Sequence, residues 1–266
     1  MAETLDLNKL AISLDINKCD NNQRKEREEC FLKYKPLPKV GPLLLTISCS
    51  NDNNFSEDVI LSAAIQLKNY INSYWRFGPN PEYNKSLCFN NDEKIIVISD
   101  EDKNFIRNKI LEAVIFIVDK ENVKVLKQFN QCVKKILKFD YKTRWKDAFV
   151  DCLIKCFNSN NQKIIYAGIM LFYQLSKLYQ YEDENNLKVY NEVLIKINDR
   201  ILFFMNECKN INNNVEAMVM YKLIKIFFKS FQGNMPELLQ TEDIFNKYSE
   251  CIVHIIKTPL NQKYVD

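Results

Sequence analysis

The feature that most constrains the fold of this chain is a succession of amphipathic segments with helical spacing along nearly its whole length. Residues 99–118 show the pattern, because apolar residues recur there every three or four positions behind an acidic first turn. Ser99, with Asp102 three residues later, predicts a capping box at the start of this segment. A second apolar stripe at 126–137 follows after a short break at 119–121, so the two segments predict a helical hairpin.

The same hairpin unit repeats along the chain. The first helices of the pairs are predicted to begin near 4, 38, 99, 142, 186 and 241. The later spacings match the roughly 40 to 47 residues of HEAT or armadillo repeats, and an inserted polar loop at 76–97 explains the larger gap before Ser99. A sheet-rich fold would lack turn residues, since the chain has only 4 glycines and 7 prolines. We therefore predict an all-α fold: a right-handed α-solenoid of roughly five and a half HEAT-like helical hairpins, forming one domain over 1–266.

The last predicted helix, at 241–257, carries an apolar stripe and has no partner helix after it. Terminal repeats of a solenoid need a polar outer face. The stripe therefore predicts that the chain is the N-terminal portion of a longer array. The alternative is that the stripe folds back on the preceding pair of helices.

Charge and cysteine usage exclude some classes of protein. The 37 basic and 34 acidic residues leave a net charge of +3, which does not by itself indicate a nucleic-acid binder. Nine cysteines are scattered without a CxxC pair, which is typical of reduced thiols in a cytosolic or nuclear protein. Cys152 and Cys156 lie one helical turn apart and can in principle hold a metal, although a buried apolar role is favoured. The longest apolar run, 164–175, is too short to cross a membrane.

No pattern of catalytic or nucleotide-binding residues is present in the sequence. His254 is the single histidine, and Lys257 one turn away is no orienting carboxylate. Neither GxxxxGK[ST] nor GxGxxG occurs. We therefore predict no enzyme, no cofactor, no metal and no direct nucleotide binding. The lysines at 120–138 have three interpretations: a solvated helix face, which is favoured, an RNA-binding face, or a contact with a protein partner.

Three motifs in order resemble the N-terminal repeats of the importin-β superfamily of nuclear transport receptors. They are "SAAIQLKNYINSYW" (62–75), "ISDEDKNFIRNKILEAV" (98–114) and "KFDYKTRW" (138–145). Residues 167–182 and 222–231 look most like the importin seven and eight subfamily, and the family's N-terminal region corresponds to about 20–98. The chain departs from the family pattern at Lys142, where a proline is usual, and at Arg27-Glu28, where alanines are usual.

The resemblance implies a receptor that shuttles between nucleus and cytoplasm and carries basic cargo proteins. Its N-terminal repeats would bind the GTP-bound form of the small GTPase Ran on a concave face lined by second helices, and nucleoporins are further expected partners. Trp75, Trp145 and Arg107 are assigned to the scaffold. The residues expected to contact Ran are polar and lie on two second helices: Lys68, Asn69, Asn72, Gln128, Gln131 and Lys135.

Two alternatives stay open at the level of sequence. An export receptor for importin-α has a similar "KNYI" helix and similar early repeats, so the direction of transport is not fixed. The second is an α-solenoid scaffold or RNA-binding adaptor that uses the lysines at 120–138.

Overall fold

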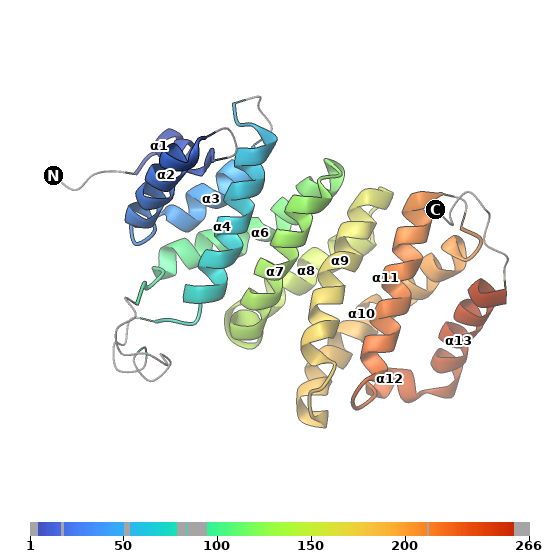
Figure 1. Cartoon of the computed structure of the whole chain (residues 1–266). Helices are drawn as coiled ribbons and strands as arrows, with labels where there is room; N and C mark the ends of the chain where they lie inside the picture. Colours follow the sequence, from blue (N-terminus) through green and yellow to red (C-terminus); the bar gives the residue numbers. More distant parts are fainter. Residues whose placement is uncertain are drawn as a thin grey trace. The chain divides into compact units, whose positions relative to one another are not determined.

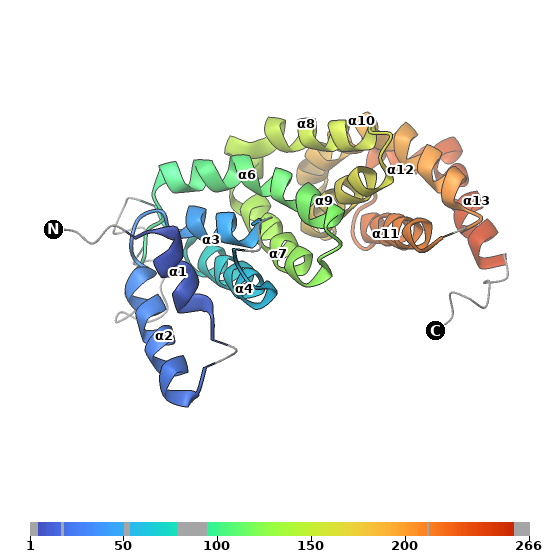
Figure 2. The ribbon, with the colours of Figure 1, turned by 90° about the horizontal axis from the view of Figure 1, so that it is seen from above.

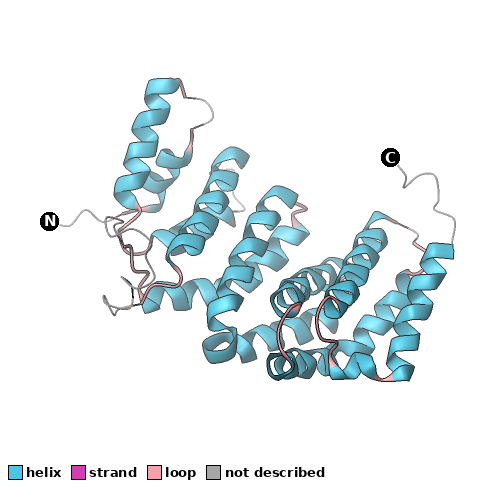
Figure 3. Ribbon diagram, turned by 60° about the horizontal axis from the view of Figure 1, so that its bottom comes forward, coloured by secondary structure: helices cyan, strands magenta, loops and turns pink. Residues whose placement is uncertain are grey.

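The protein is described from a computed structural model, which covers residues 5–16, 19–50, 54–78, 84, 95–211 and 213–257, apart from the side chains of 184 and 185. Every regular element in these ranges is helical (Figure 3), as predicted. Most of the predicted inserted loop at 76–97 lies outside the described residues. The chain forms two compact units, 1–145 and 146–266, which are considered separately below.

The described part of unit 1 contains three helical hairpins (Figure 1). Their helices are α1 (Leu7–Leu14), α2 (Asn21–Tyr34), α3 (Val40–Ser48), α4 (Glu57–Tyr74), α6 (Asp100–Asp119) and α7 (Val123–Asp140), followed by a π-helical turn, η1 (Tyr141–Trp145). From above, α3 and α6 form one layer and α4 and α7 the other (Figure 2). The hairpin predicted from the apolar stripes at 99–118 and 126–137 is confirmed.

Side-chain caps explain where several of these helices begin. The side-chain oxygen of Ser56 accepts a hydrogen bond from the backbone N–H of Val59, and Asn122 caps α7 in the same way. Ser99 caps α6 as predicted by accepting from the N–H of Asp102. A capping box also needs a hydrogen bond from the backbone N–H of Ser99 to the carboxylate of Asp102. This second part of the prediction is wrong.

The carboxylate of Asp102 bonds to another part of unit 1. It accepts a hydrogen bond from the backbone N–H of Lys39 at 2.9 Å. Lys39 has a left-handed backbone with φ of 68° directly before α3, and its N–H has no partner within that helix. The Asp102 carboxylate thus joins the start of α6 to the start of α3.

The first hairpin packs without the alanines that are usual in the family. Among the residues of α2, only Phe31 is buried. Arg27 instead forms an ion pair with Asp15 and donates to the carbonyl of Asp15, which joins α2 to the end of α1. A partly exposed polar contact therefore replaces small-residue packing here.

Unit 2 contains two further hairpins and a final helix. Its elements are α8 (Lys146–Phe157), α9 (Gln162–Tyr179), α10 (Glu184–Cys208), α11 (Asn214–Phe231), a short α12 (Glu237–Gln240) and α13 (Glu242–Lys257). α9 is buried nearly all round, as its apolar sequence predicted. Gly168 allows the close approach of α8, since a Cβ on it would lie 2.6 Å from Cβ of Cys156.

Tyr190 on α10 joins three helices in the core of unit 2. Its ring stacks on Phe172 at a centroid distance of 5.5 Å and an interplanar angle of 1°. Its hydroxyl bonds to the hydroxyls of Ser176 on α9 at 2.9 Å and Ser230 on α11 at 3.0 Å. A fully buried phenol thus has its polar atom satisfied from both neighbouring helices.

α13 packs on the preceding hairpin, a contact that fits both arrangements considered for its apolar stripe. The hydroxyl of Tyr248 donates to Asn198 on α10 at 3.0 Å, and the ring of Phe245 meets Phe231 on α11 at 5.7 Å. Val253 and Ile256 on its other side stay exposed. No helix of the described ranges is long and apolar enough to span a membrane.

Candidate functional site

The candidate surface is formed by α4 and α7, the second helices of consecutive hairpins in unit 1, which lie side by side (Figures 1 and 2). Lys68 on α4 is close enough to Cys132 on α7 to oppose the rise that burial causes in the pKa of that thiol. Seven residues further along α4, Nε1 of Trp75 donates to Oδ2 of Asp140 at 3.0 Å. Because both pairs advance in the same direction, the two helices are parallel.

The structure places all six predicted contact residues on this helix pair, at or near its surface. Three are exposed and three are half-buried; in chain order they are Lys68, Asn69, Asn72, Gln128, Gln131 and Lys135. Lys68 and Asn72 lie one turn apart on α4, and the α7 residues have the spacing of a single stripe. Of their amides, that of Gln128 makes only a long, 3.5 Å hydrogen bond to the carbonyl of Lys124. Their role in binding a partner stays a prediction.

Positive charge gathers at the C-terminal end of this surface. Partial burial lowers the pKa of Lys135, and the charges of Lys138 and Arg76 lower it further. The ammonium group of Lys135 lies 5.4 Å from the ring centroid of Phe139, and Arg76 lies over the ring of Phe77 at 4.9 Å. This end of the pair therefore favours an acidic or polar group on a partner.

A buried polar cluster fixes α4 and α7 beneath the candidate surface. The carboxylate of Asp140 accepts from Trp75 and also forms an ion pair with Arg107 of α6. Trp145 donates its Nε1 proton to the carbonyl of Arg107 at 3.2 Å, and Lys103 donates to the carbonyl of Phe77 at 2.7 Å. The scaffold role predicted for the two tryptophans and the arginine agrees with these contacts.

Asp140 and Lys103 were not singled out by the sequence patterns, although they complete this cluster. The only available signal for Asp140 was its place in the "KFDYKTRW" motif. The side chains of Arg107 and Asp140 are only 5% and 13% exposed, so the pair is held in a region of low dielectric constant. The pair joins α6 to the C-terminal end of α7.

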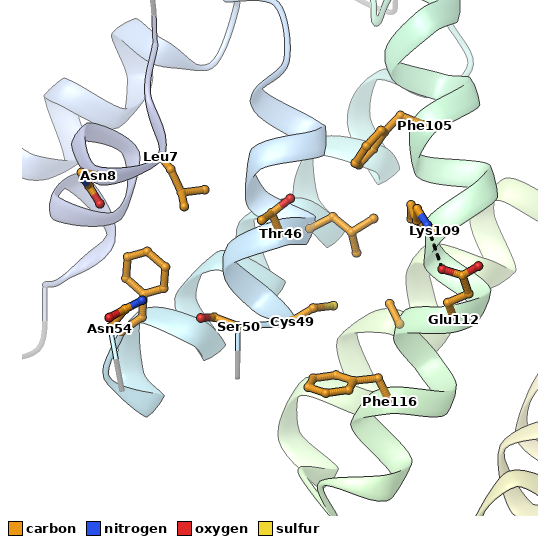
Figure 4. Close-up of a pocket in the computed structure, with 13 residues that line it drawn as sticks. Leu7, Asn8, Thr46, Cys49, Ser50, Asn54, Phe105, Lys109, Glu112 and Phe116 are labelled. Carbon is orange, nitrogen blue, oxygen red and sulfur yellow. Dashed lines mark hydrogen bonds and ion pairs between the residues drawn. The ribbon is translucent and has the colours of Figure 1, made fainter. Parts of the chain in front are cut away.

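A second feature, also missed from the sequence, is an open cleft of about 640 Å³ between α1, α3 and α6 (Figure 4). Its walls are largely apolar and include Leu45, Phe105 and Phe116. Lys109 and Glu112 form an ion pair of 3.0 Å on α6 at its edge. The cleft has none of the convergent charged groups that would indicate a catalytic site.

The described residues hold no group of three or more histidine, cysteine or carboxylate side chains suited to a metal ion. The ring of His254 lies 3.1 Å from the amide oxygen of Asn210. A hydrogen bond with Cys152, and then burial, raise the pKa of Cys156, which keeps that thiol protonated. A structural role accounts for both His254 and Cys156.

Comparison with known proteins places these helices in a family. Residues 31–115, which include α3, α4 and most of α6, match the importin-β N-terminal domain. The chain is 25% identical over 257 residues to a probable importin-7 homolog of Dictyostelium discoideum and 23% identical over 229 residues to importin-8 of Danio rerio. These matches support a relationship to the N-terminal part of importin-β superfamily proteins. The names of these relatives agree with the predicted importin seven and eight subfamily.

The fold of this chain is also that of solved transport receptors. The structure of the exportin Cse1 in its cargo-free, cytoplasmic state superposes with a TM-score of 0.72 over 94% of this chain, at 16% identity. The predicted class of HEAT-like helical hairpins is thereby confirmed. The chain covers 93% and 84% of its own length in the two sequence matches, but only 22% and 21% of the relatives. It also spans 25% of the exportin chain.

Proposed function

We propose that this chain is the N-terminal region of a nuclear transport receptor of the importin type, and not an enzyme. In this proposal it binds the GTP-bound form of Ran through α4 and α7, supports nuclear import of basic cargo proteins, and shuttles between nucleus and cytoplasm. The observation that carries the proposal is the polar, partly amide-lined surface of two parallel helices that the Asp140 cluster joins.

The chemistry of this surface suits a switchable protein partner. Asn69, Asn72 and Gln131 are exposed, and their amides both donate and accept hydrogen bonds in a wet interface. They do so without the desolvation penalty of buried charges. The receptor would sense GTP indirectly, by contacting switch segments that are ordered only when the γ-phosphate is present.

Calorimetry with Ran loaded with GTP or GDP tests the proposal on the chain as it is. We expect weak binding that is at least about tenfold tighter for the GTP form, corresponding to about 1.4 kcal/mol. The triple variant Lys68→Met, Asn69→Ala, Asn72→Ala should weaken GTP-dependent binding by a similar factor while its melting temperature changes little. Equal affinity for both nucleotide states, or no binding, would defeat the proposal.

A matched control uses the other helical layer of unit 1. Asn108 and Lys109 are exposed on α6, and the ion pair of Lys109 is a surface pair of small energetic value. The variant Asn108→Ala, Lys109→Met should therefore leave Ran binding unchanged. If this control loses as much affinity for Ran as the α4 triple variant does, the contact cannot be assigned to α4.

The alternatives give different outcomes in related measurements. An importin releases cargo when Ran binds, whereas an export receptor for importin-α binds cargo together with Ran. An RNA-binding adaptor would instead show salt-sensitive RNA binding without any Ran binding. Contact with nucleoporins is a further prediction of the receptor proposal.

A further inference from the structure

Unit 2 presents a cluster of lysines and tyrosines where α9 and α11 pack side by side (Figures 1 and 2). We call it the lysine–tyrosine patch; it consists of Tyr173, Lys177, Tyr221, Lys222 and Lys225. The ammonium group of Lys222 lies 5.0 Å from the ring centroid of Tyr173 and 5.5 Å from that of Tyr221, so it joins the two helices. Lys177 lies 4.4 Å over Tyr173, and Lys225 lies 4.2 Å over Tyr221.

Counter-charges are scarce around this patch. α9 contains no acidic residue, and α11 contains only Glu216, in its first turn, which accepts a hydrogen bond from the side chain of Asn213. Within the described residues, neither Lys222 nor Lys225 forms an ion pair, and the contacts of both are with tyrosine rings and the hydroxyl of Tyr221. Burial lowers the pKa of Lys222 and the charge of Lys225 lowers it further, as expected for cations held together without a carboxylate.

The patch is at the surface. Tyr221 is 53% exposed, and the side chains of Tyr173, Lys177, Lys222 and Lys225 are half-buried. Several ammonium groups that repel one another around two aromatic rings form a preorganised site for negative charge, because an anion relieves the repulsion when it binds.

We propose that the lysine–tyrosine patch binds an acidic peptide segment, through ammonium–carboxylate contacts between α9 and α11. This goes beyond the proposed function, in which the cargo is basic. A basic segment of cargo would be repelled at this site. The acidic segment therefore belongs to a different partner, or to a different part of the same partner.

The local chemistry favours a peptide over single-stranded nucleic acid. Nucleic-acid sites offer aromatic faces on which bases stack, and they line a track of cations along the strand. Here each tyrosine ring already has two ammonium groups within 5.5 Å of its centroid. Neither helix contains arginine, the side chain best suited to bidentate phosphate contacts. The cations also form one compact group.

Fluorescence anisotropy with the intact chain and a labelled peptide of eight glutamates tests this proposal. We expect saturable binding that weakens as NaCl is raised, and no binding of the corresponding glutamine peptide. The variant Lys222→Gln, Lys225→Gln should weaken binding by about tenfold. The single variant Lys225→Gln should weaken binding by about threefold, and it tests the site even if the double variant is unstable.

The control variant is Lys155→Gln, Lys196→Gln. It removes the same two charges from exposed positions on α8 and α10, away from the patch. It should retain at least half of the wild-type affinity. An equal loss in the control would show that binding follows net charge, and would overturn the proposal. Tighter binding of an eight-nucleotide uridine RNA than of the glutamate peptide would also overturn it, by assigning the patch to nucleic acid.

Discussion

Replacing Asp140 by alanine removes the carboxylate that joins α4, α6 and α7 in unit 1. Arg107 is 5% exposed, so the variant leaves a guanidinium group buried beside the ring of Trp75 without its counter-ion. Breaking a buried ion pair from one side costs about 3–5 kcal/mol. Trp75 also loses the acceptor of its indole N–H, whereas Arg107 keeps its hydrogen bond to Asn104. We therefore expect Asp140→Ala to lower the free energy of unfolding of unit 1 by about 3 kcal/mol, at the low end of that range.

Intrinsic fluorescence measures this effect directly. Trp75 and Trp145 are the only tryptophans of the chain, and both are buried at this cluster. A urea titration followed by tryptophan emission therefore reports the unfolding of unit 1 even if unit 2 unfolds separately. The midpoint should fall strongly while the slope of the transition stays unchanged.

Two further variants separate the buried pair from general effects of substitution. Glu112→Ala removes an ion pair whose side chains are 54% and 70% exposed, and should cost less than about 1 kcal/mol. Adding Arg107→Met to Asp140→Ala should restore at least about 1 kcal/mol, because the uncompensated charge is removed. The reasoning is refuted if Asp140→Ala costs no more than Glu112→Ala, or if the second substitution adds a further loss.

Two predictions concern unit 2. Gly168→Ala should lower the free energy of unfolding of unit 2 by about 1–2 kcal/mol, because the new methyl group would overlap Cys156. Urea titration followed by far-UV circular dichroism measures this loss. Gly78→Ala is the control, since no atom lies within 4 Å of the position of its new methyl group. Burial raises the pKa of Tyr190 from 10.0 to about 12, so the stability that this phenol contributes is fully present below pH 10 and is lost as the pH rises towards 12. Melting temperatures between pH 8 and 11.5 should fall above pH 10, and the fall should be smaller in Tyr190→Phe; an identical fall in both proteins would contradict this assignment.

Periodicity and caps predicted the helices well, because both are local properties of the sequence. The predicted starts near 38, 99, 186 and 241 lie within two residues of the observed helices. The start near 142 is less simple, because a π-helical turn at 141–145 precedes α8. The cap by Ser99 was predicted correctly, whereas the bond of Asp102 to the N–H of Lys39 was not, because its donor is 63 residues away.

The candidate site was predictable only in part. The polar stripe at Lys68, Asn69 and Asn72 is visible in the sequence because it follows the helical repeat. The cluster below it was not, because Asp140 meets its partners through contacts between different hairpins. The lysine–tyrosine patch was missed for the same reason: its residues come from two helices that are distant in the sequence, and the lysines of each helix alone look like ordinary solvated charges.

The hydroxyl of Tyr190 has a consequence for how the apolar helices of unit 2 keep their alignment. Apolar surfaces alone allow two packed helices to slide along each other, since a shift of one turn, about 5.4 Å, replaces one aliphatic neighbour with another. Only one longitudinal setting of α9 and α11 brings Ser176 and Ser230 to the phenol together. In a shifted arrangement, one of these buried hydroxyl groups would lose its hydrogen-bond partner. The hydroxyl of Tyr190 therefore favours a single alignment of α9 and α11.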